Sequence, residues 1–186
     1  DDLIKDFNIN EVQKAGAIFD ITKLDWLNSQ HLSNLNLDEF KNYLEPFLKK
    51  LNIDIKSHSN VDLLIDSMKT SENTLSGIAK LLIPYYTDEI LYDDNAIDKF
   101  FSDDNSIIKD IRDILITIDD WNEFNLDSVL RKYQTDNNLS VPKVNQPIRI
   151  ALTGSTKSPS LGLTLTIFGK DKSLQRIEKL ISHLKN

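Results

Sequence analysis

The stretch that decides the fold class is Ser106–Ile118, which runs SIIKDIRDILITI. Its apolar residues recur at the three- and four-residue spacing that places them on one face of a helix. A helix of this kind is stable only when it buries that face against another element. The stretch therefore predicts an amphipathic helix that packs within a bundle.

Helical spacing of apolar residues also covers most of the remaining chain. It is found in residues 37–51, 61–68, 75–84, 126–133 and 174–184. Glycine and proline number five each, about half their usual frequency, so the chain has few turn-forming residues. Together these patterns predict an all-α protein built from small helical bundles.

Residues 161–168, LGLTLTIF, are the exception to this pattern. Apolar residues alternate there with small or polar ones, and by itself that alternation predicts a β-strand. A strand at this position would need a partner, for which residues 147–152 are the nearest candidate. The residues alone leave helix and strand open here.

The composition excludes several classes of protein. Of the 186 residues, 40% are hydrophobic and 27% charged, which is typical of a globular chain with one domain or two small ones. The absence of cysteine excludes disulfides, thiolate nucleophiles, zinc–cysteine sites and iron–sulfur clusters. No apolar run approaches the roughly 20 residues of a membrane-spanning helix. We therefore expect a cytoplasmic chain without a membrane partner that, lacking an initiator Met, is processed or part of a longer protein.

The charge is distributed unevenly along the chain. The net charge is −7, but residues 1–130 carry −14 and residues 131–186 carry +7. A basic C-terminal third indicates a nucleic acid or another anionic partner. The alternative is that the two parts of the chain complement each other electrostatically.

No catalytic or metal-binding pattern is visible in the sequence. The three histidines, His31, His58 and His183, are far apart and lack metal-ligand spacing. Phosphate-binding glycine loops and the G-x-S-x-G nucleophile motif are also absent. We therefore expect no catalytic residue, no metal and no cofactor within these 186 residues.

Two stretches have the chemistry of a binding site. In the first, Asp20 starts a helix in which Trp26 is expected to anchor the core and Lys23 could contact a phosphate. In the second, Arg149 lies in an apolar run just before a Ser/Lys/Pro loop, where its guanidinium could reach a base edge or a phosphate. Pro159 and Leu161 could offer flat apolar surfaces to unstacked bases. The alternative for Arg149 is a side chain that packs along a helix with its charge in solvent.

At these stretches the chain resembles the C-terminal half of bacterial glutamyl-tRNA synthetases. Residues 17–28 match the family pattern A-x-F-D-x-x-K-L-x-W-x-N, and residues 146–154 match Q-P-[LIV]-R-x-A-L-T-G. Ser158-Pro159 and Phe168-Gly169-Lys170-Asp171 follow, as the S/T-P and L-G-K-E elements do in the family. The order and spacing of these motifs extend the resemblance over essentially the whole chain.

The resemblance implies an all-α fold of the class I synthetase anticodon-binding type. Residues 1–55 would form a stem-contact region, and residues 56–124 and 125–186 two small helical bundles. The partner would be tRNA(Glu), with tRNA(Gln) left open as a second, and the chain would be a monomer. ATP would bind in a catalytic domain outside this chain. The positions implied to meet the anticodon are Arg149, Ser158, Pro159 and Leu161, and those implied to meet the tRNA backbone are Lys23, Arg131, Lys132, Lys157 and Arg176.

Two departures from the family pattern matter. The family often carries R-x-K-T-L where this chain has Ser71-Glu72-Asn73-Thr74-Leu75, so a basic residue is missing and an acid stands beside its position. We therefore hypothesise relaxed discrimination between the glutamate and glutamine tRNAs. The family is helical across residues 161–168, and we predict a helix there against the local pattern.

The rival function is a helical protein-interaction domain that uses its basic C-terminal face.

Overall fold

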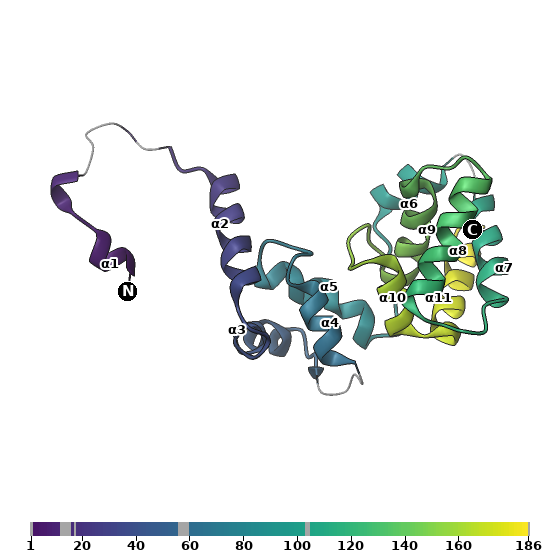
Figure 1. Cartoon of the computed structure of the whole chain (residues 1–186), viewed down its shortest axis with the longest axis horizontal. Coiled ribbons are helices and arrows are strands. Elements are labelled where there is room, and N and C mark those ends of the chain that lie inside the picture. Colours follow the sequence, from purple (N-terminus) through teal and green to yellow (C-terminus); the bar gives the residue numbers. More distant parts are fainter. Residues whose placement is uncertain (1, 12–15, 17, 56–59, 103–104, 186) are drawn as a thin grey trace.

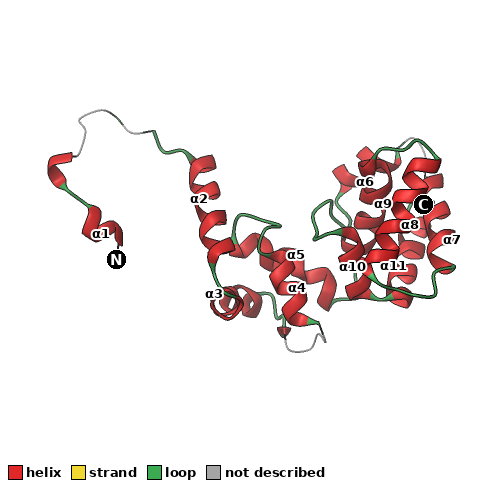
Figure 2. Cartoon of the chain, in the orientation of Figure 1, coloured by secondary structure: helices red, strands yellow, loops and turns green. Residues whose placement is uncertain are grey.

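The computed structural model describes residues 2–11, 16, 18–55, 60–102 and 105–185, and in them it is helical without a strand (Figure 2). The predicted all-α class is confirmed. The elements are α1 (Asp2–Asp6), a 3-10 helix (Ile9–Glu11), α2 (Ile21–Asn34), α3 (Leu37–Lys50), α4 (Val61–Met68), α5 (Leu75–Tyr86), α6 (Asp94–Phe101), α7 (Ser106–Ile116), α8 (Glu123–Asp136), α9 (Val141–Thr153), α10 (Leu161–Phe168) and α11 (Lys170–His183).

The helices pack in two groups, shown side by side in Figure 1. We call α2–α5 the N-terminal bundle and α6–α11 the C-terminal bundle. In the first, α3 packs against α4 and α5; in the second, α9 contacts α6, α7, α8, α10 and α11. The chain crosses from one to the other in residues 87–93. Two packing contacts, α3 on α5 and α7 on α11, cross the boundaries between the expected regions 1–55, 56–124 and 125–186. The division into a stem-contact region and two bundles stays a prediction.

Local sequence signals explain where several helices begin. At the start of α3, the Asn36 side chain accepts a hydrogen bond from the Glu39 N–H at 2.9 Å, and the Glu39 carboxylate accepts one from the Asn36 N–H at 3.2 Å. This reciprocal capping box satisfies two backbone donors that a helix start leaves without partners. Thr74 and Asp93 cap α5 and α6 with their side-chain oxygens.

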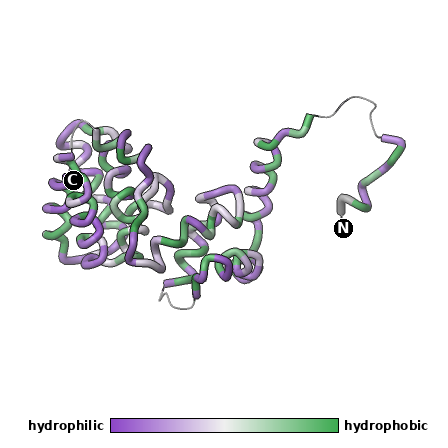
Figure 3. The backbone as a smooth tube through the Cα atoms, turned by 180° about the vertical axis from the view of Figure 1, so that it is seen from behind, coloured by the Kyte–Doolittle hydropathy of each residue, from purple (hydrophilic) through white to green (hydrophobic). Residues whose placement is uncertain are grey.

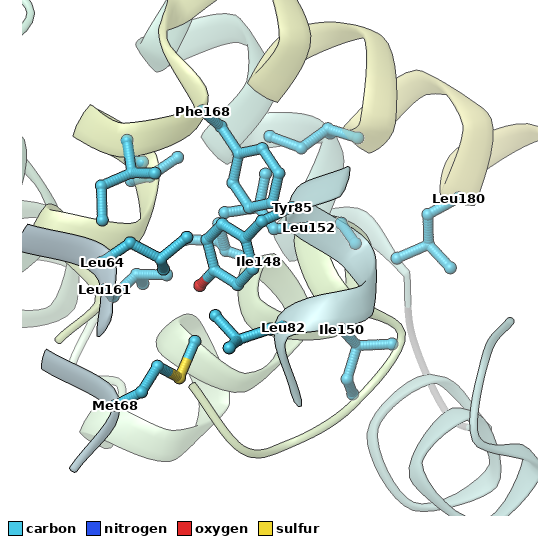
Figure 4. Packing of buried hydrophobic residues seen from close by; sticks show 14 of the residues in the cluster. Leu64, Met68, Leu82, Tyr85, Ile148, Ile150, Leu152, Leu161, Phe168 and Leu180 are labelled. Atoms are coloured by element: carbon cyan, nitrogen blue, oxygen red, sulfur yellow. The ribbon is translucent and has the colours of Figure 1, made fainter. Parts of the chain in front are cut away.

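A continuous apolar core joins the two bundles (Figure 4). Met68 of α4 and Tyr85 of α5 lie in the same cluster as Ile148 of α9, Leu161 and Phe168. The Tyr85 and Phe168 rings stack with their centroids 4.6 Å apart. Because apolar burial is the main favourable term in folding, this shared core stabilises the contact between the bundles as well as each bundle.

Residues 161–168 form helix α10, as the resemblance implies and against the local strand pattern. Six of the eight residues are buried, because α10 is covered by α8, α9 and α11. A helix buried on most sides shows no amphipathic stripe in its sequence. The threonine hydroxyls are accommodated within the helix: Thr164 donates to the Ser160 carbonyl at 2.9 Å and Thr166 to the Gly162 carbonyl at 2.8 Å.

The expectation that Trp26 anchors the core is wrong. Its side chain is 57% exposed, because the first turns of α2 extend beyond α3–α5 (Figure 1). Leu32 is the buried residue of α2. Figure 3 shows apolar residues, in green, just before and within α2. The side chains of Ile18 and Phe19, which precede this helix, are exposed. None of the helices in the described part of the chain has the length and apolarity to cross a membrane.

Candidate nucleic-acid interface

Arg149 holds the loop that connects α9 to α10. Gly154 ends α9 with a φ of +75°, a conformation that favours glycine, and residues 155–160 form the loop. Nε of Arg149 donates to Oγ of Ser158 at 2.7 Å, and Nη2 donates to the Pro159 carbonyl at 3.2 Å. Desolvation lowers the pKa of the half-buried Arg149 guanidinium, which still titrates far above neutral pH. The structure therefore brings Arg149 together with Ser158 and Pro159, and the two hydrogen bonds of Arg149 fix the conformation of the loop.

Two hollows flank this loop, and Ser160 lines both of them. One, of about 340 Å³, lies between α8, α9 and the start of α10, and Arg131 and Arg149 are in its wall. The other, of about 480 Å³, lies between the loop and the end of α4, with Lys157 in its wall. The loop thus stands between two concave surfaces, one with Arg131, Arg149 and Asp127 in its wall and the other with Lys157. Basic side chains in a groove are a feature of surfaces that bind a phosphate backbone.

The basic residues around the loop differ in their availability. Arg131 and Lys132 are exposed on α8. Lys157 is also exposed, but its Nζ lies 2.5 Å from Oε2 of Glu72, in the segment between α4 and α5. The hydrogen bond from Lys157, helped by one from the Asn73 N–H, lowers the pKa of the Glu72 carboxyl. The ion pair thus links the loop of one bundle to the other bundle and satisfies part of the Lys157 charge.

Pro159 and Leu161 are buried, so they cannot offer flat surfaces to unstacked bases and that expectation is wrong for both. Leu161 is 3% exposed because it begins a helix that enters the core between the bundles (Figure 4). Pro159 is held down by Arg149, which binds its carbonyl. At this loop, Ser160 is exposed and Ser158 is partly exposed.

Arg176 also lies elsewhere than expected. It is 2% exposed and donates hydrogen bonds to the carbonyls of Pro84, Thr87 and Leu152. A guanidinium enclosed by three carbonyls at the ends of α5 and α9 cannot reach a tRNA phosphate, so the expected contact of Arg176 with the tRNA backbone is wrong. Its position could have been found in the sequence, because Ser173, Arg176, Ile177 and Leu180 share one helical face.

Lys23 is exposed but lies on α2, far along the chain's long axis from the α9–α10 loop (Figure 1). Its backbone N–H donates a hydrogen bond to Oδ1 of Asp20, which caps the start of α2, at 3.1 Å. A contact between Lys23 and the stem of an RNA stays a prediction. Ala17, in the same motif, lies outside the described residues.

Other residues of the candidate interface had no signal in the sequence. Gln134 of α8 donates to Oδ1 of Asn145 of α9 at 2.8 Å, and both line the smaller hollow beside the exposed Val141. Such residues become neighbours only through the packing of two helices. Among the described residues no three His, Asp or Glu side chains are placed to hold a metal ion; His58 lies outside them.

Comparison with known proteins identifies the family. A model described as "Anticodon binding domain" matches residues 38–181. Curated relatives include the glutamate–tRNA ligase of Myxococcus xanthus, 31% identical over 178 residues, and glutamate–tRNA ligase 2 of Thermosipho melanesiensis, 31% identical over 184 residues. The alignments cover 95% and 96% of this chain but 37% and 40% of those relatives.

Solved structures show the same fold. A glutamate tRNA ligase from Elizabethkingia meningosepticum superposes with a TM-score of 0.72 at 23% identity, over 98% of this chain and 36% of that one. The glutamate-tRNA synthetase of Elizabethkingia anophelis gives a TM-score of 0.70 over 97% of this chain and 35% of that one. The resemblance to glutamyl-tRNA synthetases is thereby confirmed, and the match over residues 38–181 shows that this chain belongs to the anticodon-binding domain family.

Proposed function

We propose that this chain is the tRNA-binding, anticodon-recognising part of a glutamate–tRNA ligase, which joins glutamate to tRNA(Glu) with ATP in protein synthesis. The observation that carries the proposal is the α9–α10 loop, which Arg149 holds between two hollows lined by Arg131 and Lys157. The basic C-terminal third of the chain supports it, because neutralising phosphates supplies much of the affinity for RNA.

The residues would divide the work in the following way. Arg131, Lys132 and Lys157 would contact phosphates and position the RNA, whereas the loop around Ser158 and Ser160 would face the anticodon bases. Arg149 would act on the bases through the loop that it shapes. Glutamate and ATP would bind in a part of the ligase outside this chain, and the ligase would act in the cytoplasm as a monomer.

Glu72 supports relaxed discrimination between tRNA(Glu) and tRNA(Gln). Its carboxylate pairs with Lys157, so the loop faces an acid that stands beside the position where the family often has a basic residue and this chain has none. An acid repels phosphate and cannot donate a hydrogen bond to a base. Charging assays of the full ligase on both tRNAs test this point: comparable charging is expected, and rejection of tRNA(Gln) would contradict it.

The binding role is tested by titrating this chain with tRNA(Glu) at several salt concentrations. The affinity should fall steeply as salt rises, because bound cations are released from the RNA. A Kd that is insensitive to salt, or no binding at about 50 mM salt, would contradict the proposal. Binding of an acidic protein in place of RNA would favour the rival, a protein-interaction domain.

A further inference from the structure

The segment that connects the two bundles is bound along α11. The Thr87 carbonyl accepts a hydrogen bond from Nη2 of Arg176 at 2.6 Å, and the Asp88 carbonyl accepts one from Nζ of Lys179 at 3.2 Å. The Asp88 carboxylate pairs with Lys172 at 3.0 Å. Three cations of one helix therefore hold the start of the connecting segment, which would otherwise be a natural hinge.

The far end of the same segment is also fixed. The Asp93 N–H donates to the Gly154 carbonyl at 2.9 Å, at the C-terminus of α9. A Cβ at Gly154 would lie 2.1 Å from the Leu91 carbonyl oxygen, so glycine allows the segment to lie directly against α9. Residues 87–93 are thus held to the C-terminal bundle at both ends.

Arg176 is the centre of this arrangement. Its Nη2 is 2.6 Å from both the Pro84 and the Thr87 carbonyls at the end of α5, and its Nη1 donates to the Leu152 carbonyl near the end of α9. A cation at two helix C-termini is stabilised by their dipoles and by the carbonyls that the helices leave without partners. One side chain of α11 thereby joins the N-terminal bundle to α9.

An aromatic stack continues this connection. The Cζ of Arg176 lies 4.4 Å from the centroid of the Phe168 ring, and that ring stacks on Tyr85 with an interplanar angle of 12°. Tyr85 belongs to α5 and is 4% exposed. The order guanidinium, Phe168, Tyr85 therefore runs from α11 through α10 into the N-terminal bundle.

We infer that Arg176 is a positioning residue that fixes the two bundles in one orientation, so that the α4–α5 segment and the α9–α10 loop form a single binding surface. The importance of this surface for RNA rests on the proposed function. An apolar residue would fill the site with less desolvation cost, but only a planar guanidinium can serve three carbonyls and stack on a ring.

The orientation can be measured without RNA. The chain has no cysteine, so Asn42→Cys on α3 and Ser128→Cys on α8, both exposed, accept spin labels at two unique sites, one in each bundle. Pulsed electron paramagnetic resonance then gives the distribution of distances between the two labels in the parent, in Arg176→Met and in Arg176→Lys. Leu180→Ala, which empties a buried position on the same helix, controls for lost stability.

The parent and Leu180→Ala should each give one narrow distance, whereas Arg176→Met should give a broad or shifted distribution and bind tRNA(Glu) roughly tenfold more weakly. Arg176→Lys keeps the positive charge but lacks the planar guanidinium, so it should also broaden the distance distribution. If Arg176→Met does not fold, Arg176→Lys provides the test by itself. An unchanged distance in a folded Arg176 variant would overturn the inference, as would a broadened distance with unchanged tRNA binding. If the parent itself binds no tRNA, the proposed function fails and the distances alone decide whether Arg176 fixes the orientation.

Discussion

Nζ of Lys157 lies 2.5 Å from Oε2 of Glu72, although the two residues are 85 positions apart and belong to different bundles. The contact places an acid against the loop that we propose as the RNA-binding surface. An exposed ion pair of this kind contributes at most about 1 kcal/mol to stability. A larger effect is expected on RNA affinity, because the Glu72 carboxylate competes with an RNA phosphate for the Lys157 ammonium group.

Removing the Glu72 charge should therefore strengthen RNA binding. We expect Glu72→Gln to tighten the Kd for tRNA(Glu) about twofold to fivefold at low salt, as an ion pair worth up to about 1 kcal/mol is released. The slope of log affinity against log salt should steepen, because one more cation meets phosphate. Titrations with Glu45→Gln, on the distant α3, give the control; equal effects of the two variants would contradict a specific role for Glu72.

The same pair predicts a pH dependence. Folding lowers the pKa of Glu72 below its ordinary value of 4.5, so the pair's stabilisation is complete above that value and is lost as the pH falls through the lowered pKa. NMR titration of the Glu72 carboxyl should show the lowered pKa in the parent and a return toward the ordinary value in Lys157→Met. A Glu72 pKa that is the same in both proteins would show that Lys157 is not its cause.

Arg149 should matter through the geometry of its loop and not through its charge alone. Arg149→Ala removes the hydrogen bonds to Ser158 and Pro159 and should lower the preference among anticodon stem-loops by about 1–3 kcal/mol. Arg149→Lys keeps the charge but not the fork, so it should lose nearly as much preference. Parallel titrations with stem-loops of different anticodon sequence measure this; full preference in Arg149→Lys would refute the geometric role.

The exposed cations of α8 should affect all RNA sequences alike. Arg131→Gln combined with Lys132→Gln would remove the two phosphate contacts that we propose, so the slope of log affinity against log salt should fall by about 2. In titrations with an anticodon stem-loop, which lacks the rest of the tRNA, the pair Lys49→Gln and Lys50→Gln on α3 removes the same charge far from the loop and should change the slope little. A sequence-dependent loss from the α8 variant would instead indicate base contacts.

Gly162 should be intolerant of a side chain. A Cβ there would lie 2.5 Å from Oδ1 of Asp127 and 2.9 Å from the Glu123 carbonyl oxygen, where α10 crosses α8. Gly162→Ala should therefore destabilise the fold by about 1–3 kcal/mol in chemical denaturation. Gly16→Ala, with nothing within 4 Å of its Cβ, is the matched control; equal unfolding curves for the two variants would be inconsistent with close packing at Gly162.

The sequence predicts the helices well where one face is buried and less well elsewhere. Stretches such as 106–118 alternate buried and exposed sides, so their periodicity is visible. Residues 161–168 form helix α10 despite their strand-like pattern, because packing against three neighbouring helices buries most sides of the segment. Burial of Arg176 could be read from its helical face, whereas the pairing of Lys157 with Glu72 depends on how two bundles meet, which no local pattern encodes.

The most direct test of the binding surface is a titration of the isotope-labelled chain with the anticodon stem-loop of tRNA(Glu), followed by amide chemical shifts. The shifts should concentrate at Arg131, Lys132 and residues 155–160 and disappear at high salt. Little change is expected on α7, which lies across the C-terminal bundle from the α9–α10 loop (Figure 1), except at Asp110, which accepts a hydrogen bond from Tyr133 of α8. Shifts confined to another face, or none at low salt, would contradict the assignment of the α9–α10 loop as the RNA-binding surface.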